Sequence, residues 1–336
     1  MGEKNYGGSS NIPKGKFEVV RTSTSEIKLK EKNDKLTESL SLTYGEIENY
    51  RKAGKIASQV RDYARKIIKK NMKLVEVADK IEGKILELGG ELAFPVNLSI
   101  DEVAAHFSHN ADDEKLAEGL LKIDLGVSFN GYIADLAFSI DLENNEENKK
   151  LIEASENALK EALKIISKNI EIWEIGKKIQ EVIESYNFSP VKNLSGHSLS
   201  RYLIHSGFTL PNYNDGNKNK LPEGAYALEP FATSGVGMIY ESRDSGIYSL
   251  VRKQAVRDSE ARKLLDFIEK KYKTMPFCKR WLEKDYGKKI NLALSMLEKA
   301  GSIRAYPELV EKSKKKVAQA EHSFIIFEDR VEIITI

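Results

Sequence analysis

The sequence contains a single cysteine, Cys278, so no disulfide can form within the chain, as is typical of a protein in a reducing compartment. It has no run of about 18 apolar residues that could cross a membrane, and no apolar signal segment at its N-terminus. Neither charge dominates, because 53 Lys and Arg face 51 Asp and Glu. This balance argues against a protein that binds membranes or specific nucleic acids. We therefore expect a soluble cytoplasmic protein.

The N-terminal segment has little that would fold by itself. Residues 1–42 are rich in Gly, Ser, Lys and Thr and show little helical periodicity. We expect a flexible N-terminal extension there and one large domain over residues 43–336. Thr43 and Glu46 have the spacing of a capping box, which predicts that the first helix of this domain begins at this point.

One block of sequence occurs twice. Residues 67–71 (IIKKN) are echoed by residues 165–169 (IISKN), and each block continues through a proline to the tripeptide Asn-Leu-Ser, at 97–99 and 193–195. Each copy reads as two helices that lead into strands. The pattern predicts an α+β fold with duplicated halves that share a sheet. Duplicated halves commonly meet at a cleft, where we expect a functional site.

Residues 250–316 differ from the repeated blocks. We expect three short helices there, at 258–272, 277–284 and 289–300, between two strand-like stretches. We interpret this segment as an inserted helical subdomain. Three short helices also occur in helix-turn-helix proteins, but the basic residues of this segment are interleaved with acidic ones, which disfavours DNA binding.

Two aspartates lie on a predicted hairpin at residues 120–140. Asn130-Gly131 between two β-rich runs indicates a two-residue turn, whose positions both need φ > 0. Such a turn places Asp124 and Asp135 as diagonal neighbours on one face. Two carboxylates this close in apolar strands repel each other unless a cation or a proton lies between them. The alternative is that each aspartate caps a loop or meets an arginine elsewhere.

His197 follows a glycine in Asn-Leu-Ser-Gly-His, and His205 stands eight residues later in an apolar setting. Glu229 and Glu321 occupy strand-like runs, where glutamate is uncommon. Alone, each residue could be a satisfied core histidine or a glutamate at a sheet edge. Together with the hairpin, the two glutamates and one histidine would form an oxygen-rich site of four carboxylates and one imidazole, which suits Mn, Fe or Co, with Zn also feasible. Four carboxylates balance two divalent ions, and two ions about 3.5–4 Å apart can lower the pKa of a shared water.

The strings around these residues resemble the metal-binding segments of the methionine aminopeptidases in order and spacing. They are KIDLGVSFNGYIAD, NLSGHSLSRYLIHSG, ALEPFATSGVG and QAEHSFII. The resemblance covers roughly residues 43–336 and implies the pita-bread (creatinase/aminopeptidase) fold, a pseudo-twofold α+β architecture, with two divalent metal ions (Co, Mn, Fe or Zn). The helical segment between Glu229 and Glu321 is similar to that of type 2 enzymes, whereas type 1 enzymes and prolidases bring these glutamates closer in sequence.

The resemblance also implies roles for the metal-binding residues. Asp124 would bind one ion, and Asp135 and Glu321 would bridge both ions. His197 and Glu229 would bind the second ion, and Glu229 would also carry a proton during catalysis.

Further residues resemble substrate-binding positions of the family. His106 is similar to the histidine that contacts the scissile amide, and His205 to the second active-site histidine, which positions the substrate backbone. Phe94, Ile204 and Tyr306 match positions that line the methionine side-chain pocket, and aromatic and branched walls of this kind suit a thioether.

The resemblance thus implies an enzyme that removes the initiator methionine from nascent proteins and prefers a small second residue. Two alternatives stay open: a prolidase or aminopeptidase P that acts at X-Pro bonds, and a non-catalytic pita-bread protein associated with the ribosome or RNA. The helical insertion counts against the first alternative, and the complete set of five ligands counts against the second. We expect a monomer whose basic residues could aid docking on the ribosome.

Overall fold

The computed structural model describes residues 42–287 and 290–336, so the extension predicted for residues 1–42 lies outside it, except for Leu42. The first half of the fold consists of the helices α1 (Tyr44–Ile67) and α2 (Leu74–Glu87) and the strands β1 (Glu91–Ile100), β2 (Val103–Ala105), β3 (Leu120–Phe129) and β4 (Tyr132–Asp141). The second half repeats this order with α3 (Glu146–Ile165), α4 (Ile172–Ser185), β5 (Ser189–Pro190), β6 (Ser195–Leu199), β7 (Thr209–Pro211), β8 (Gly224–Leu228) and β9 (Phe231–Thr233).

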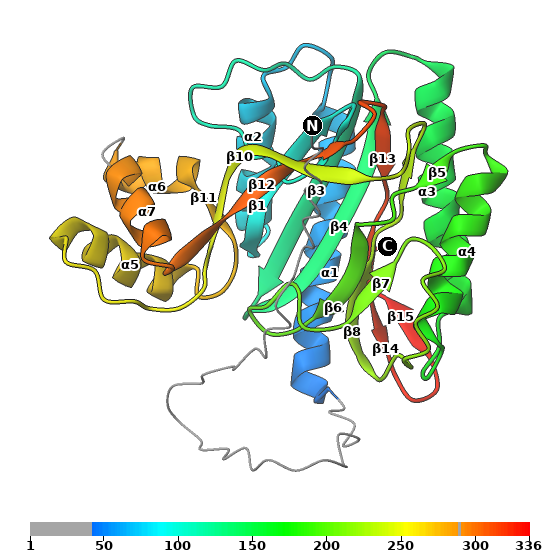
Figure 1. The fold of residues 1–336 in the computed structure, drawn as a ribbon. Helices are drawn as coiled ribbons and strands as arrows, with labels where there is room; N and C mark the ends of the chain where they lie inside the picture. Colours follow the sequence, from blue (N-terminus) through cyan, green and yellow to red (C-terminus); the bar gives the residue numbers. More distant parts are fainter. Residues whose placement is uncertain (1–41, 288–289) are drawn as a thin grey trace, which may run out of the picture. The chain divides into compact units, whose positions relative to one another are not determined.

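The remaining elements complete the sheets and add three helices. They are β10 (Ile239–Leu250), α5 (Ser259–Lys271), β11 (Phe277–Cys278), α6 (Lys279–Tyr286), α7 (Ile290–Lys299), β12 (Ile303–Glu311), β13 (Val317–Gln319), β14 (His322–Ile326) and β15 (Val331–Ile333). Within the described residues, the strands form four small sheets with the orders β1-β3-β4, β11-β10-β12-β2, β13-β9-β5 and β15-β14-β8-β6-β7. Helices α1 and α2 pack against the first of these sheets, and α3 and α4 pack on strands of the second half (Figure 1).

The first helix begins where its capping box predicts. The Thr43 backbone N–H donates to Glu46 Oε2 at 2.8 Å, and the Glu46 N–H donates to Thr43 Oγ1 at 3.4 Å. Helix α1 then packs on β3 and β4 through buried alanines that include Ala53 and Ala57. Because these side chains are small, the helix can lie close to the sheet.

The two halves share a detailed backbone feature, which supports the predicted duplication. In the loop between α1 and α2, Asn71 has φ 68°, and its N–H donates to the Ala117 carbonyl at 2.8 Å. In the loop between α3 and α4, Asn169 has φ 66°, and its N–H donates to the Leu221 carbonyl, also at 2.8 Å. Asparagine tolerates this left-handed conformation better than most residues, so both blocks need it at the same point.

The β3–β4 hairpin has the predicted register. Asn130 and Gly131 form the turn with φ 52° and 86°, and Asp135 lies opposite Gly126. Asp124 is thus a diagonal neighbour of Asp135 on the same face of the hairpin, as the turn chemistry predicts.

Within the described part of residues 250–316, the helices run from Ser259 to Lys299. Residues 277–278 form a short strand, β11, where the start of a helix was expected. Residues 303–311 belong to β12, which pairs along β10. The segment therefore leaves a sheet on one strand and returns to it on the neighbouring strand.

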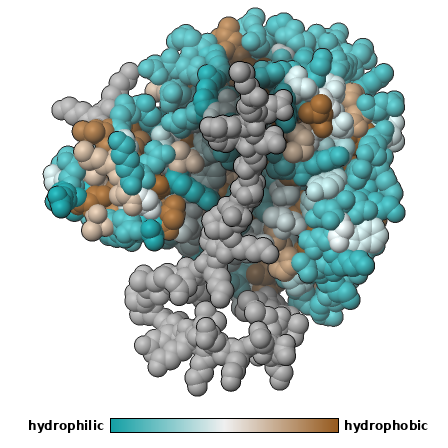
Figure 2. Space-filling view, viewed as in Figure 1, coloured by the Kyte–Doolittle hydropathy of each residue, from teal (hydrophilic) through white to brown (hydrophobic). Residues whose placement is uncertain are grey.

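Most of the surface in view is polar. Figure 2 shows a mainly hydrophilic face over α3 and α4, with hydrophobic residues scattered on the side where α5, α6 and α7 lie. Leu292 on α7, at 66% exposure, is one of the exposed apolar residues. Among the helices of residues 42–287 and 290–336, none combines the length and apolar composition of a membrane span.

A buried ion pair attaches the inserted helices to the first half. Arg280 on α6 is 1% exposed, and its guanidinium donates to both carboxylate oxygens of Glu82 on α2, at 2.6 and 3.0 Å. The Trp281 indole N–H donates to the same carboxylate at 2.8 Å. Because the Glu82 carboxylate is removed from water, its charged form is stabilised by these donors instead.

We expect Arg280→Met to lower the free energy of unfolding by about 3–5 kcal/mol, because it leaves the Glu82 carboxylate buried without its partner. Urea denaturation followed by circular dichroism measures the change. The control Lys263→Met removes a side chain that is 70% exposed and should change the value by less than about 0.5 kcal/mol. Equal losses for the two variants would contradict the anchoring role of Arg280.

Candidate metal centre

All ten residues predicted for the site line one cavity of about 390 Å³. Asp124 lies on β3, Asp135 on β4 and His197 on β6, whereas Glu229 directly follows β8 and Glu321 directly precedes β14. The N-terminal half thus contributes the two aspartates, and the C-terminal half contributes the histidine and both glutamates. The other five of these ten residues are Phe94, His106, Ile204, His205 and Tyr306.

The polar residues of this cavity lie close enough to share cations. His197 Nε2 lies 3.6 Å from Asp135 Oδ2 and 3.8 Å from Glu229 Oε1. One ligand atom from each of Asp135, His197 and Glu321 falls within 4.8 Å of the others, and these three residues are buried. Asp124 and Glu229 are half-buried at the cavity wall.

The carboxylates of this site destabilise one another's charge. Burial raises the pKa of Asp124 to about 7. Burial, followed by the charges of neighbouring carboxylates, holds the pKa of Asp135, Glu229 and Glu321 well above the usual range. Such an arrangement is unfavourable at neutral pH without protons or cations to compensate the charge.

Unpartnered oxygens show that the residues fit divalent cations. Within the described part of the chain, Asp124 Oδ1, Asp135 Oδ1 and Glu321 Oε1 have no hydrogen-bond partner, although all three are buried atoms. The donor set is hard, since Cys278 is buried in the separate core of the inserted helices. Carboxylates with one imidazole suit Mn, Fe, Co or Zn.

Gln319 belongs to this site and is missing from the sequence prediction. It is 1% exposed on β13, and its Nε2 donates to Glu229 Oε2 at 3.3 Å. It therefore holds the Glu229 carboxylate. The signal was present in the string QAEHSFII, because Gln319 stands two residues before Glu321 and alternate residues of an extended chain share a face.

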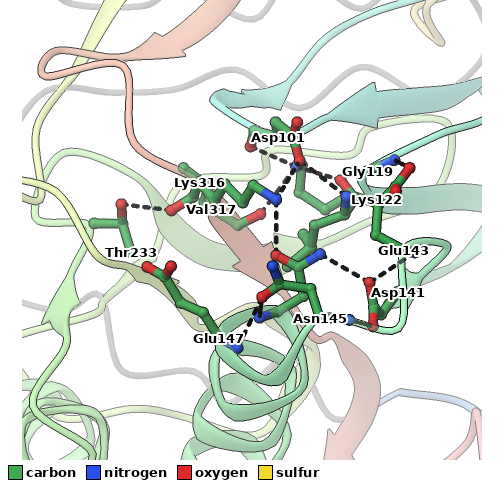
Figure 3. Close-up of polar contacts among 12 residues, drawn as sticks. Asp101, Gly119, Lys122, Asp141, Glu143, Asn145, Glu147, Thr233, Lys316 and Val317 are labelled. Atoms are coloured by element: carbon green, nitrogen blue, oxygen red, sulfur yellow. Dashed lines mark hydrogen bonds and ion pairs between the residues drawn. The ribbon is translucent and has the colours of Figure 1, made fainter.

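A second polar network, which includes Lys122 and Lys316, is drawn in Figure 3. The buried Lys122 ammonium on β3 donates to the carbonyls of Asp101 and Val317, each at 2.9 Å. Lys316 donates to Asn148 Oδ1 on α3 at 3.0 Å. Lys122 is two residues from Asp124, and Val317 is two residues from Gln319, so this network joins the two halves directly beside the site.

Apolar residues form a wall beside the carboxylates. Phe94 and Ile204 are each 7% exposed, and the Phe94 ring lies directly over Gly126, where an added Cβ would come within 2.2 Å of the ring. Gly126 is thus a second residue that the sequence prediction missed. The Tyr306 ring meets the His106 ring edge to face at 5.3 Å.

The two further histidines of the cavity have distinct surroundings. His106 has φ 59°, and its Nδ1 has no hydrogen-bond partner within the described residues. Burial, then nearby charges of His205 and Arg304, lower the pKa of His106 to about 4, so its imidazole is neutral at pH 7. The His205 ring packs edge to face on His197 at 4.4 Å.

Comparison with known proteins gives consistent matches. Residues 48–258 match the model of metallopeptidase family M24. The methionine aminopeptidase of Methanocaldococcus jannaschii is 46% identical over 296 residues, which are 86% of this chain and 99% of that protein. The methionine aminopeptidase of Pyrococcus abyssi is 44% identical over 84% of this chain and 97% of that protein.

Solved structures of lower identity share the fold. A thermophilic Arx1 has a TM-score of 0.77 at 15% identity, covering 88% of this chain and 91% of that one. The methionine aminopeptidase of Thermotoga maritima has a TM-score of 0.64 at 21% identity, covering 88% and 99%. The prolidase of Pyrococcus furiosus has a TM-score of 0.57 at 19% identity, covering 89% and 66%. These likenesses confirm the predicted pita-bread fold.

We expect Gln319→Ala to weaken the binding of Mn or Co by roughly 10–100-fold, because residues that orient ligating carboxylates commonly contribute this much. Isothermal titration of metal-stripped protein measures the affinity. Gln59→Ala, on the exposed face of α1, is the matched control and should bind as the parent does. Unchanged affinity in Gln319→Ala would show that the carboxylates hold their places without this amide.

Proposed function

The chain belongs to metallopeptidase family M24 and, within it, to the methionine aminopeptidases, and on this basis we propose that it is a type 2 enzyme with two divalent metal ions. Its activity is metal-dependent removal of the initiator methionine from proteins. The observation that supports the two-metal proposal is the cluster of four carboxylates and His197 in one cavity, with buried oxygens that lack partners. The type 2 assignment rests on the inserted helices α5, α6 and α7 between Glu229 and Glu321. We assign catalysis to residues 43–336.

The proposed ligand roles are those that the resemblance to the family implies. Asp124 would bind one ion, Asp135 and Glu321 both ions, and His197 and Glu229 the other. When bound, such ions supply a Lewis acid and lower the pKa of a water molecule. Gln319 would keep Glu229 oriented during the reaction.

Residues of the chain would handle the substrate itself. His106 would donate a hydrogen bond to the oxyanion that develops from the scissile carbonyl, since its ring nitrogen Nδ1 has no partner within the described chain. His205, whose ring packs on His197, would position the substrate backbone. Glu229 would transfer the proton to the leaving amine.

The apolar wall would hold the methionine side chain. Phe94, Ile204 and Tyr306 line the cavity together, and a flexible thioether packs well against such rings and branched chains. We further propose that the limited width of the cavity favours a small second residue. The monomeric state and docking on the ribosome remain predictions from the sequence.

The central prediction concerns metal removal. Metal-stripped protein should release no methionine from Met-Ala-Ser, and addition of Mn, Co, Fe or Zn should restore release for the ions that it uses. Met-Leu-Ser should be cleaved much more slowly. Chromatographic quantification of free methionine measures both rates. Faster cleavage of X-Pro dipeptides than of Met-Ala-Ser would instead favour a prolidase.

A second prediction tests the bridging role of Asp135. Asp135→Ala should reduce methionine release to the background rate, because both ions would lose a shared ligand. Asp329→Ala, which removes a carboxylate that is 75% exposed, should retain the parent rate. Normal turnover by a folded Asp135→Ala protein would contradict the proposed ligand set.

A further inference from the structure

Arg304 contacts Tyr306, which lines the cavity, and is not needed to explain the reaction. It is exposed on β12, opposite Ser249 of β10. The next pair on the same face of these strands is Tyr306 and Ile247, which both line the cavity. Arg304 is therefore one same-face step, about 7 Å along the strand, from the cavity wall.

The guanidinium of Arg304 is held in one orientation. Its carbon lies 5.0 Å from the centre of the Tyr306 ring, and Nη2 donates to Tyr306 Oη at 3.0 Å. Nε donates to Ser249 Oγ at 3.3 Å. These two contacts leave further N–H groups of the fork for another acceptor.

Within residues 42–287 and 290–336, no carboxylate forms an ion pair with Arg304. Arg243 on the neighbouring strand β10 does have such a partner, since its Nε lies 3.0 Å from Glu308 Oε2. An arginine that is oriented by neutral groups and lacks an acidic partner is suited to bind a carboxylate of a ligand.

We propose that Arg304 selects substrates that carry a carboxylate beyond the second residue, by binding this group beside the cavity wall. The inference rests on the proposed aminopeptidase function. With the methionine in the cavity, an extended peptide advances about 3.3–3.6 Å per residue, so its third residue lies about 7 Å further out. This distance matches the step of about 7 Å along β12 from Tyr306 to Arg304. The carboxylate is either an Asp or Glu side chain or the C-terminus of a short peptide.

The test compares peptides that differ in one charge. For the metal-loaded enzyme, kcat/KM for Met-Ala-Asp-amide should exceed that for Met-Ala-Asn-amide by about 3–5-fold at low salt, as expected for a partly exposed ion pair. Comparison of Met-Ala-Ser with Met-Ala-Ser-amide tests the C-terminal carboxylate in the same way. A preference in either pair that depends on Arg304 supports the proposal and identifies the source of the carboxylate.

Variants separate recognition from a structural role of Arg304. Arg304→Gln should bring the ratio of kcat/KM for Met-Ala-Asp-amide to kcat/KM for Met-Ala-Asn-amide to about 1. Arg304→Glu should reverse the charge preference and favour Met-Ala-Lys-amide over Met-Ala-Asp-amide. Arg330→Gln is the matched control, because Arg330 also stacks on an aromatic ring, Phe327 at 4.2 Å, and it should keep the parent ratio.

Two outcomes would overturn the inference: ratios near 1 in the parent enzyme for both peptide pairs, or a parent preference that survives in Arg304→Glu. An enzyme that releases methionine without any carboxylate preference refutes this inference alone. A metal-loaded protein that cleaves none of these peptides refutes the proposed function.

Discussion

The repulsion among four carboxylates in one cavity is the constraint on which the rest of this structure depends. Asp124, Asp135, Glu229 and Glu321 come from separate strands and converge where burial raises the pKa of each. A chain that only maximised its stability would keep these charges apart or in water. The fold must therefore hold them together by other contacts until cations compensate their charge.

Those contacts are polar and join the two halves beside the site. The Ser323 hydroxyl accepts from the Asp135 N–H and donates to the Asp135 carbonyl, both at 2.8 Å, and so fixes β4 against β14. The Ser139 hydroxyl does the same for Gln319, at 2.9 Å to its N–H and 2.8 Å to its carbonyl. With Lys122, these serines hold the backbone beside the carboxylates while the carboxylate side chains keep unpartnered oxygens within the described residues.

Local signals made the first part of this arrangement predictable. The hairpin register follows from the φ values that Asn130 and Gly131 must adopt, and the duplication follows from a repeat held over some thirty residues. The five proposed ligands were predicted from the aspartate hairpin and from the resemblance of four strings to the metal-binding segments of the family. The contacts that fix them in place were not predicted, because Ser323 and Asp135 are 188 positions apart and Arg280 and Glu82 are 198 apart. No local pattern marks one serine or one arginine for such a partner.

The duplication also shows why a repeat alone does not define a site. Its two Asn-Leu-Ser tripeptides bring Asn97 and Asn193 to the same cavity. The Asn193 amide exchanges two hydrogen bonds with the Ile239 backbone, at 2.7 and 2.8 Å, and thereby fixes the start of β10. Asn97 donates to the Pro95 carbonyl at 2.9 Å, whereas its Oδ1 has no partner within the described residues. Equivalent residues thus perform different tasks because their neighbours differ. Both groups of the Asn193 amide bind the backbone of the cavity wall, whereas Asn97 still presents Oδ1 as a hydrogen-bond acceptor.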